Sequence, residues 1–504
     1  MKAIWMSCLV LLLIVLVACG GSSSSGFPVT PPAPNNAGYS NASLKGTYVF
    51  NLRGVGAGND VFAVAGVFTA DGNGNITSGQ EDVNDLAVGL LQQDQLTTGT
   101  YSIGIDGRGQ AKLTFLSGNV ANLQFVLVSS SKARVIELSG SELSSGVFEL
   151  QDSTALAALT GPAYVLRMDG YANTGAPISR VGSLTASGGT GSAASVVLDE
   201  NYNGTFTPTI AASSTFNLTG TSGRGTLQFV TTQGAASGSG TTLDLVFYVV
   251  NSTRIEFLSI NTAEQVSGYA DAQSGTFTTA SVGSPNAYAY AIAGSTVNGN
   301  NFITETGSFT LNSGSVTNGL EDFVDGGSYS ASVAFAGSYS SPAANNGRFT
   351  GSFTTSSRTF NFVLWFSSTQ SAVLMATSEV LNGNTLPLVE SGLVTLQPAV
   401  PTAATVSGNY ALHLGGVTSN VSTVLDGQLL ADGVGTFTGL EDFNQGGSVT
   451  VGASAGGSYS VAAGRGSGTI GGIPVVFYPA SSSTIYVMST DGRRMLGGSL
   501  ETQH

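Results

Sequence analysis

The chain has 504 residues, of which 69 are glycine and only 9% are charged, and its formal net charge is −14. An acidic protein is repelled by phosphates, so this charge argues against nucleic acid or an anionic bilayer face as a partner. High glycine content with abundant serine and threonine is typical of an extracellular β protein rich in turns.

The first 18 residues have the features of a signal peptide. Lys2 supplies a positive charge, Leu9 to Val17 is an apolar run too short to span a bilayer, and Ala18 is a small residue at the expected cleavage point. Residues 1–18 are therefore excluded from the fold. Residues 19–43 follow as a segment rich in Gly, Ser, Pro and Asn, which cannot bury enough apolar surface to fold and is predicted to be a tether.

The stretch LVACGG (Leu16 to Gly21) resembles the lipobox of bacterial lipoproteins. This resemblance implies that Cys19 is lipidated after cleavage. It also implies an outer-membrane or cell-surface location, because Gly20 stands where an aspartate would retain a lipoprotein at the inner membrane. With Cys8 removed and Cys19 lipidated, the mature chain has no cysteine pair for a disulfide.

Internal repeats divide the rest of the chain. An opening strand recurs around four tyrosines: Tyr48, Tyr164, Tyr288 and Tyr410. A closing strand recurs with a glycine five residues before a glutamine: Gly146 and Gln151, Gly268 and Gln273, Gly392 and Gln397, Gly498 and Gln503. The openings and closings alternate, which predicts four units over residues 44–152, 157–274, 283–398 and 405–504. Short connectors between them predict beads with limited freedom.

The first unit shows strand periodicity and no helical periodicity. Alternation and turn signals predict eight strands, over residues 46–53, 61–70, 75–84, 97–105, 110–116, 122–129, 133–139 and 145–151. Consecutive strands joined by tight turns can close as a meander, which removes both sheet edges. The fold predicted is all-β, with four tandem eight-stranded barrels. A β-sandwich in each unit is the alternative, and a propeller that shares strands between units is a further one.

The general plan is similar to that of avidin or lipocalin barrels, although no sequence motif of either family is present. The whole array resembles tandem-repeat lipoproteins of some soil bacteria, and this resemblance implies no activity.

The chain offers little that could support catalysis. Its two histidines are His413, in the fourth opening strand, and the C-terminal His504, and neither recurs between units. No zinc spacing, nucleophile elbow or phosphate loop is found. The sequence therefore predicts no catalytic residues, no metal and no cofactor.

Each unit carries an acidic pair: Glu81-Asp82, Asp199-Glu200, Glu321-Asp322 and Glu441-Asp442. A glycine-flanked arginine follows 23 to 27 residues later: Arg108, Arg224, Arg348 and Arg465. Adjacent carboxylates could bind calcium, but neighbours on a strand point to opposite faces. The favoured interpretation is that one acid of each pair, namely Asp82, Glu200, Asp322 or Asp442, pairs with its unit's arginine or caps a turn.

Aromatic residues recur on the second face of the sixth strand, at Tyr248, Trp365 and Tyr478, with Val128 at this place in the first unit. An exposed aromatic column could stack on sugars or anchor a protein, and a buried one would fill the joints between units.

Four copies of one fold on a lipid tether indicate a membrane-anchored extracytoplasmic lipoprotein with a structural or multivalent binding role toward polysaccharide or a surface protein. The alternative is a small-ligand carrier or enzyme that uses one deviating repeat. The longer insert at Gln233 to Thr242 points to the second unit for this role.

Overall fold

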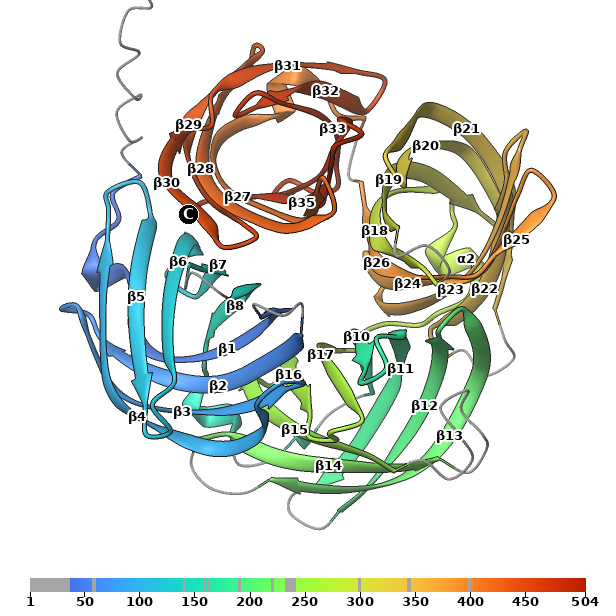
Figure 1. Cartoon of the computed structure of the whole chain (residues 1–504). Coiled ribbons are helices and arrows are strands. Elements are labelled where there is room, and N and C mark those ends of the chain that lie inside the picture. Colours follow the sequence, from blue (N-terminus) through green and yellow to red (C-terminus); the bar gives the residue numbers. More distant parts are fainter. Residues whose placement is uncertain are drawn as a thin grey trace, which may run out of the picture.

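A computed structural model gives the fold and describes residues 37–504, apart from 57–59, 139–141, 157–158, 161–162, 189–191, 219–221, 232–241, 298–300, 342–345 and 398–399. The predicted signal peptide, Cys19, residues 20–36 of the predicted tether and nearly all of the insert in the second unit lie outside the described residues. Residues 37–43 were also predicted to belong to the tether, but they pack on barrel 1, where Ile105 accepts the backbone N–H groups of Ala37 and Tyr39. The chain forms four antiparallel sheets in sequence order (Figure 1). The prediction of an all-β fold of tandem eight-stranded barrels is confirmed.

Barrel 1 agrees closely with the strands predicted for the first unit. It consists of β1 (Lys45–Val55), β2 (Val61–Asp71), β3 (Asn75–Asp85), β4 (Gly89–Ile103), β5 (Arg108–Phe115), β6 (Val120–Ser129), β7 (Lys132–Glu137) and β8 (Leu143–Leu150). Only β4 differs markedly, because it begins at Gly89 instead of residue 97. The two apolar residues of its first half, Leu90 and Leu91, are adjacent and are followed by polar residues, so this half lacks the apolar alternation that reveals a strand in a sequence.

The other three barrels repeat this order with small additions. Barrel 2 consists of β10 (Tyr164–Ala172), β11 (Pro177–Gly188), β12 (Ser192–Tyr202), β13 (Thr205–Leu218), β14 (Arg224–Thr231), β15 (Thr242–Asn251), β16 (Arg254–Ser259) and β17 (Glu264–Ala272), with β9 (Leu159–Thr160) beside β11. Barrel 3 consists of β18 (Asn286–Thr296), β19 (Phe302–Asn312), β20 (Ser315–Asp325), β21 (Ser328–Ser340), β22 (Arg348–Thr354), β23 (Arg358–Ser368), β24 (Ser371–Leu381) and β26 (Leu388–Leu396), with β25 (Asn384–Leu386) beside β24.

Barrel 4 has an interrupted fourth strand, formed by β30 (Ser448–Ser454) and β31 (Gly457–Ala462). Its other strands are β27 (Ser407–Thr418), β28 (Val421–Asp432), β29 (Thr436–Gln445), β32 (Arg465–Ile470), β33 (Ile473–Pro479), β34 (Thr484–Ser489) and β35 (Arg494–Thr502). Short helices are η1 (Asn41–Ser43), η2 (Ser153–Ala155), α2 (Thr279–Val282) and η3 (Ala403–Thr405). Among the described residues, no helix has the length and apolar composition needed to cross a membrane.

The recurrent glycine of the closing strand is explained by barrel closure. Each opening strand pairs with its second strand on one side and with its closing strand on the other. A Cβ atom on Gly146 would lie 1.8 Å from the Asn51 carbonyl oxygen, and one on Gly268 would lie 1.9 Å from that of Arg167. Only glycine allows the first and last strands to approach this closely.

The recurrent tyrosine of the opening strand links the apolar lumen to a turn at the end of the barrel. Its ring is buried among the apolar side chains that fill the barrel, and in three barrels its hydroxyl donates to a turn carbonyl between the sixth and seventh strands. The oxygen–oxygen distances are 2.6 Å for Tyr48 to Ser130, 2.9 Å for Tyr164 to Ser252 and 2.8 Å for Tyr288 to Thr369. A buried tyrosine with a satisfied hydroxyl therefore fixes the register at one end of the barrel.

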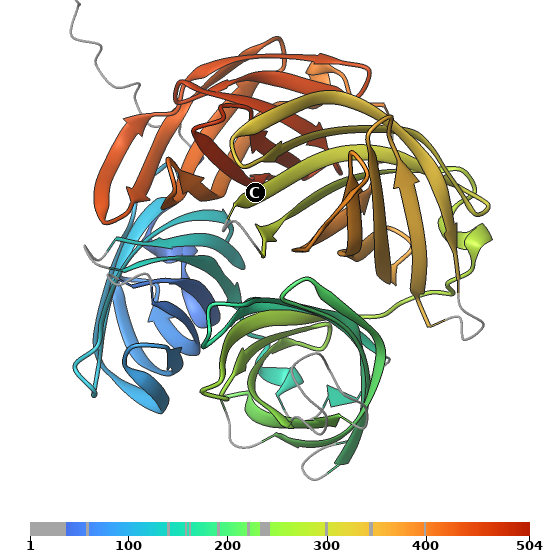
Figure 2. The same ribbon diagram turned by 45° about the vertical axis from the view of Figure 1, so that its right-hand side comes forward.

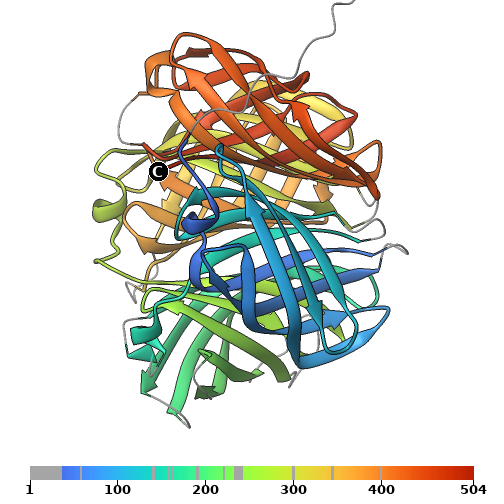
Figure 3. The same ribbon diagram turned by 90° about the vertical axis from the view of Figure 1, so that its left-hand side faces the viewer.

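The four barrels stand side by side in a closed ring (Figure 1, Figure 2). Barrel 1 lies between barrel 2 and barrel 4, as its two neighbours in Figure 3 show. Apolar clusters join barrels 1 and 2, 2 and 3, and 3 and 4, and two smaller clusters join barrel 4 to barrel 1. The units are thus packed against one another, which corrects the expectation of beads on short connectors.

Candidate functional site

The two acids of each recurrent pair point to opposite faces of their strand, as alternation requires. In barrel 1, Glu81 lies in the lumen and Asp82 on the outer face, with exposed fractions of 2% and 0%. In barrel 2 the order is reversed. Asp199 has the register of Asp82, whereas Glu200 lies in the lumen with its carboxylate 2.8 Å from Arg180 Nε. The interpretation that Glu200 is the acid paired with Arg224 was therefore wrong.

Each outer aspartate forms an ion pair with the arginine of the next barrel, and not with the arginine of its own unit. The pairs are Arg224 to Asp82, Arg348 to Asp199, Arg465 to Asp322 and Arg108 to Asp442, with nitrogen–oxygen distances of 2.7, 2.8, 2.7 and 3.0 Å. The outer surface of a barrel is convex, so side chains that point outward from one barrel move away from each other. They can therefore contact the side chains of a neighbouring barrel. The fourth pair joins barrel 4 to barrel 1 and closes the ring.

The recurrent aromatic residues lie in the same joints. Tyr248 and Tyr478 donate their hydroxyls to Asp82 and Asp322, at 2.5 and 2.6 Å, and Trp365 donates its indole N–H to Asp199 at 2.7 Å. All three have an exposed fraction of 0%, so they form no exposed aromatic column. Val126, not Val128, occupies this place in barrel 1, because it lies opposite the first arginine of the cycle.

The closing glutamines form a second cycle that the sequence analysis missed. Each side-chain amide donates to carbonyl oxygens of the next barrel: Gln151 to Ser222 and Val249, Gln273 to Asn346 and Phe366, Gln397 to Pro479, and Gln503 to Asp106 and Leu127. The signal was present in the fixed spacing between the closing glycine and the glutamine. Gln503 makes on barrel 1 the same contacts that the other glutamines make on their successors.

The lumen of barrel 1 holds a cavity of about 350 Å³ whose charged lining is acidic. Glu81 accepts a hydrogen bond from Asn119 Nδ2 at 2.9 Å. The other acids that line the cavity are Asp85, Glu137 and Glu142, and no lysine or arginine is among its described lining residues. Burial raises the pKa of Glu81 to about 8, the Asn119 hydrogen bond opposes this rise, and Asp94 and Glu137 add to it.

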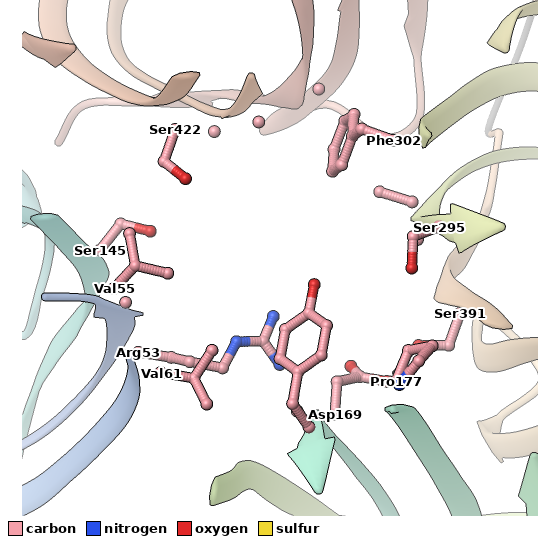
Figure 4. Close-up of a pocket in the computed structure, with 18 of the residues that line it drawn as sticks. Arg53, Val55, Val61, Ser145, Asp169, Pro177, Ser295, Phe302, Ser391 and Ser422 are labelled. Carbon is pink, nitrogen blue, oxygen red and sulfur yellow. The ribbon is translucent and has the colours of Figure 1, made fainter. Parts of the chain in front are cut away.

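A separate pocket of about 320 Å³ lies at the centre of the ring and is lined by residues of all four barrels (Figure 4). The position five residues after the recurrent tyrosine lines it in every barrel. This position is Arg53, Asp169, Ala293 and Gly415 in the four barrels. The ring therefore brings the four copies of this position together at its axis. Because a different residue occupies each copy, they form a single asymmetric site.

Two arginines of this axial pocket have different surroundings. Arg167 lies 2.8 Å from Asp169 and donates to the side chain and the carbonyl oxygen of Ser391. Burial acts to raise the pKa of Asp169, but Arg167, Arg53 and two serine hydroxyls outweigh it and hold the pKa below its usual range. Arg53 is exposed, points into the pocket, and makes no hydrogen bond or ion pair with any residue that the structure describes (Figure 4).

Serine hydroxyls and aromatic rings complete the lining. The serines are Ser145, Ser179, Ser295, Ser391 and Ser422, and the aromatic residues are Tyr171 and Phe302. His413 also lies at this pocket, with its Nδ1 2.5 Å from Asp426 Oδ1 on the adjacent strand β28. His413 is thus a strand residue on the inner side of the ring. His504 donates its backbone N–H to Val128 of barrel 1.

Comparisons with known proteins add little to this geometry. No protein-family model and no curated protein matches the chain. Among solved structures, kievitone hydratase from Nectria haematococca is similar over 74% of this chain and 94% of its own, with 8% sequence identity and a TM-score of 0.17. A similarity at that TM-score indicates neither a shared fold nor a shared activity.

Proposed function

We propose that this protein is a membrane-anchored extracytoplasmic lipoprotein whose ring binds one small anionic, hydroxyl-bearing ligand in the axial pocket. Acidic monosaccharides, free or at the end of a polysaccharide, have this chemistry. The observation that carries the proposal is the guanidinium of Arg53, which is exposed in a concave site and lacks an anionic partner within ion-pair distance among the described residues. A guanidinium binds a carboxylate through two parallel hydrogen bonds, and the surrounding serines can bind hydroxyl groups.

The repeat geometry favours one ligand per ring over multivalent binding. The residues that recur in four copies lie between the barrels, where neighbouring barrels cover them. The residues that line the axial pocket differ from barrel to barrel. A volume of about 320 Å³ suits a ligand the size of a single sugar residue.

We expect Arg53→Gln to weaken the binding of glucuronate or galacturonate by about 10- to 100-fold, because a charge-assisted hydrogen bond contributes roughly 1.5–3 kcal/mol. Isothermal titration calorimetry on the folded ring measures this change. Lys112→Gln is the matched control, since Lys112 is an exposed cation of barrel 1 outside the pocket.

The ligand panel also includes glucose, glucose 6-phosphate and an acidic disaccharide. These distinguish a carboxylate from a phosphate and a free sugar from a chain end. Equal affinity for glucose and glucuronate, or no binding across the panel, would contradict the proposed anion site.

The anchor is tested separately. Cys19→Ala should abolish acyl labelling and move the protein from the detergent phase to the aqueous phase, while the far-ultraviolet circular dichroism of the ring stays unchanged. The reason is that lipidation requires the cysteine thiol. A tether of residues 19–36 would hold the ring roughly 21–25 Å from the lipid, because residues 37–43 pack on barrel 1. Equal detergent-phase recovery of variant and wild type would refute the anchor.

A further inference from the structure

Barrel 3 encloses an unusual set of charges in its lumen. Four glutamates and one arginine lie there with exposed fractions of at most 4%: Glu305 on β19, Glu321 on β20, Arg358 on β23, Glu379 on β24 and Glu390 on β26. A single guanidinium cannot neutralise four carboxylates. Burying several unpaired charges is costly, so this lumen requires a further source of positive charge or protons.

Arg358 satisfies only part of the cluster. It donates to both carboxylate oxygens of Glu379, at 2.8 and 3.1 Å, to one oxygen of Glu321 at 3.1 Å, and to one oxygen of Glu305. Both carboxylate oxygens of Glu390 are buried without a hydrogen-bond partner, and so is the second oxygen of Glu305. Buried polar atoms without partners are rare in native proteins, and each calls for a missing group.

Three of the four glutamates lie close enough to share one ligand. Glu305, Glu379 and Glu390 each place one carboxylate oxygen within 4.8 Å of the other two. Oxygens that bind one Ca²⁺ at about 2.3–2.6 Å are at most about 5 Å apart. Three carboxylates and no nitrogen or sulfur donor form the ligand set that hard cations such as Ca²⁺ and Mg²⁺ prefer.

The other barrels lack this arrangement at the same positions. Strand pairing places Ser144, Val266 and Leu496 where barrel 3 has Glu390, and Val64, Arg180 and Leu425 where it has Glu305. Of the three acids, Glu305 and Glu390 are therefore found at these positions in barrel 3 alone. A lumen that needed only packing would keep the apolar residues seen at these positions in barrel 4.

We propose that the lumen of barrel 3 binds one hard divalent cation, Ca²⁺ or Mg²⁺, through Glu305, Glu379 and Glu390. This site is independent of the axial pocket and of its ligand. Without a cation, burial and the neighbouring carboxylates raise the pKa of Glu390 well above its usual range, so protons are the competitor for the same oxygens.

The test uses chelator-treated wild-type protein, Glu390→Gln, and Glu81→Gln as a control with a neutralised lumen carboxylate in another barrel. Each is titrated with Ca²⁺ and with Mg²⁺ by isothermal calorimetry, and its metal content after purification is measured by mass spectrometry. We expect wild type and Glu81→Gln to bind one equivalent of one of the two cations, and Glu390→Gln to bind it at least tenfold more weakly.

Glu390→Ser, which introduces the residue that barrel 1 has at this position, is a second variant with the same expected loss and guards against a glutamine that packs badly. Uptake of neither cation at millimolar concentration by the wild type would overturn the proposal, because protons alone would then neutralise the cluster. Unchanged binding by both Glu390 variants would also overturn it, since the cation would lie elsewhere.

Discussion

Replacing Asp199 with alanine should lower the free energy of unfolding by about 3–5 kcal/mol, which is the cost of leaving one member of a buried ion pair without its partner. The Asp199 carboxylate is completely buried and accepts two hydrogen bonds from Arg348, at 2.8 Å each, and one from the Trp365 indole at 2.7 Å. It also accepts the backbone N–H of Thr209. The substitution leaves all these donors between barrels 2 and 3 without an acceptor.

Urea unfolding followed by circular dichroism and by tryptophan fluorescence measures this effect. The chain has two tryptophans, Trp5 and Trp365, and in a protein that begins at residue 19 only Trp365 contributes, so its emission reports on this joint directly. Asp442→Ala is the matched control in the joint between barrels 4 and 1, where the pair is more exposed and no aromatic donor is present. Its loss should be smaller, and equal losses at the two joints would contradict the importance of burial.

Raising the pH from about 5 to 8 should destabilise the protein, and Glu81→Gln should remove a large part of this dependence. The pKa of Glu81 is about 8 in the folded protein and 4.5 for an ordinary glutamate, so the folded state holds a proton that the unfolded chain has released. The unfolded state binds fewer protons in this range, and stability therefore falls as the pH rises. For a group this buried, the difference corresponds to roughly 4 kcal/mol.

Two other buried acids change stability in the same direction. Burial raises the pKa of Glu256 to about 8 and that of Glu441 to about 7. Thermal unfolding of wild type and Glu81→Gln at pH 5, 6, 7 and 8 isolates the contribution of Glu81. The two proteins should be similar at pH 5, and the variant should be several kcal/mol more stable at pH 8. A constant difference across the series would show that Glu81 ionises freely in the folded barrel.

The barrels themselves could be predicted from the sequence, because the patterns that define their strands and turns lie within short segments of the chain. Apolar side chains at every second position, such as Leu123, Phe125 and Leu127 on β6, define a face that must be buried. Turn residues at regular intervals then give consecutive antiparallel strands, and the recurrent closing glycine marks where the last strand meets the first. The first half of β4 was not predicted, because its two apolar residues, Leu90 and Leu91, are adjacent and do not alternate with polar residues.

The contacts of the outer face of each barrel could not be predicted from the sequence. Periodicity shows that a strand has two different faces, but it does not show which part of the chain packs against each face. The recurrent aspartates, arginines and aromatic residues had the correct spacing for pairing within a unit, and only the ring places Arg224 against Asp82 of the preceding barrel.

The two proposed sites depend even more on tertiary structure. Arg53 carries no motif, and it becomes a site residue only because four opening strands face one axis. Glu305, Glu379 and Glu390 lie on three strands separated along the chain and meet only inside a closed barrel. The sequence by itself determined the repeats, the strands and the lumen-facing side chains, since these follow from local alternation. The ring, its ion pairs and its sites were decided by tertiary structure, because they arise from contacts between strands far apart in the chain.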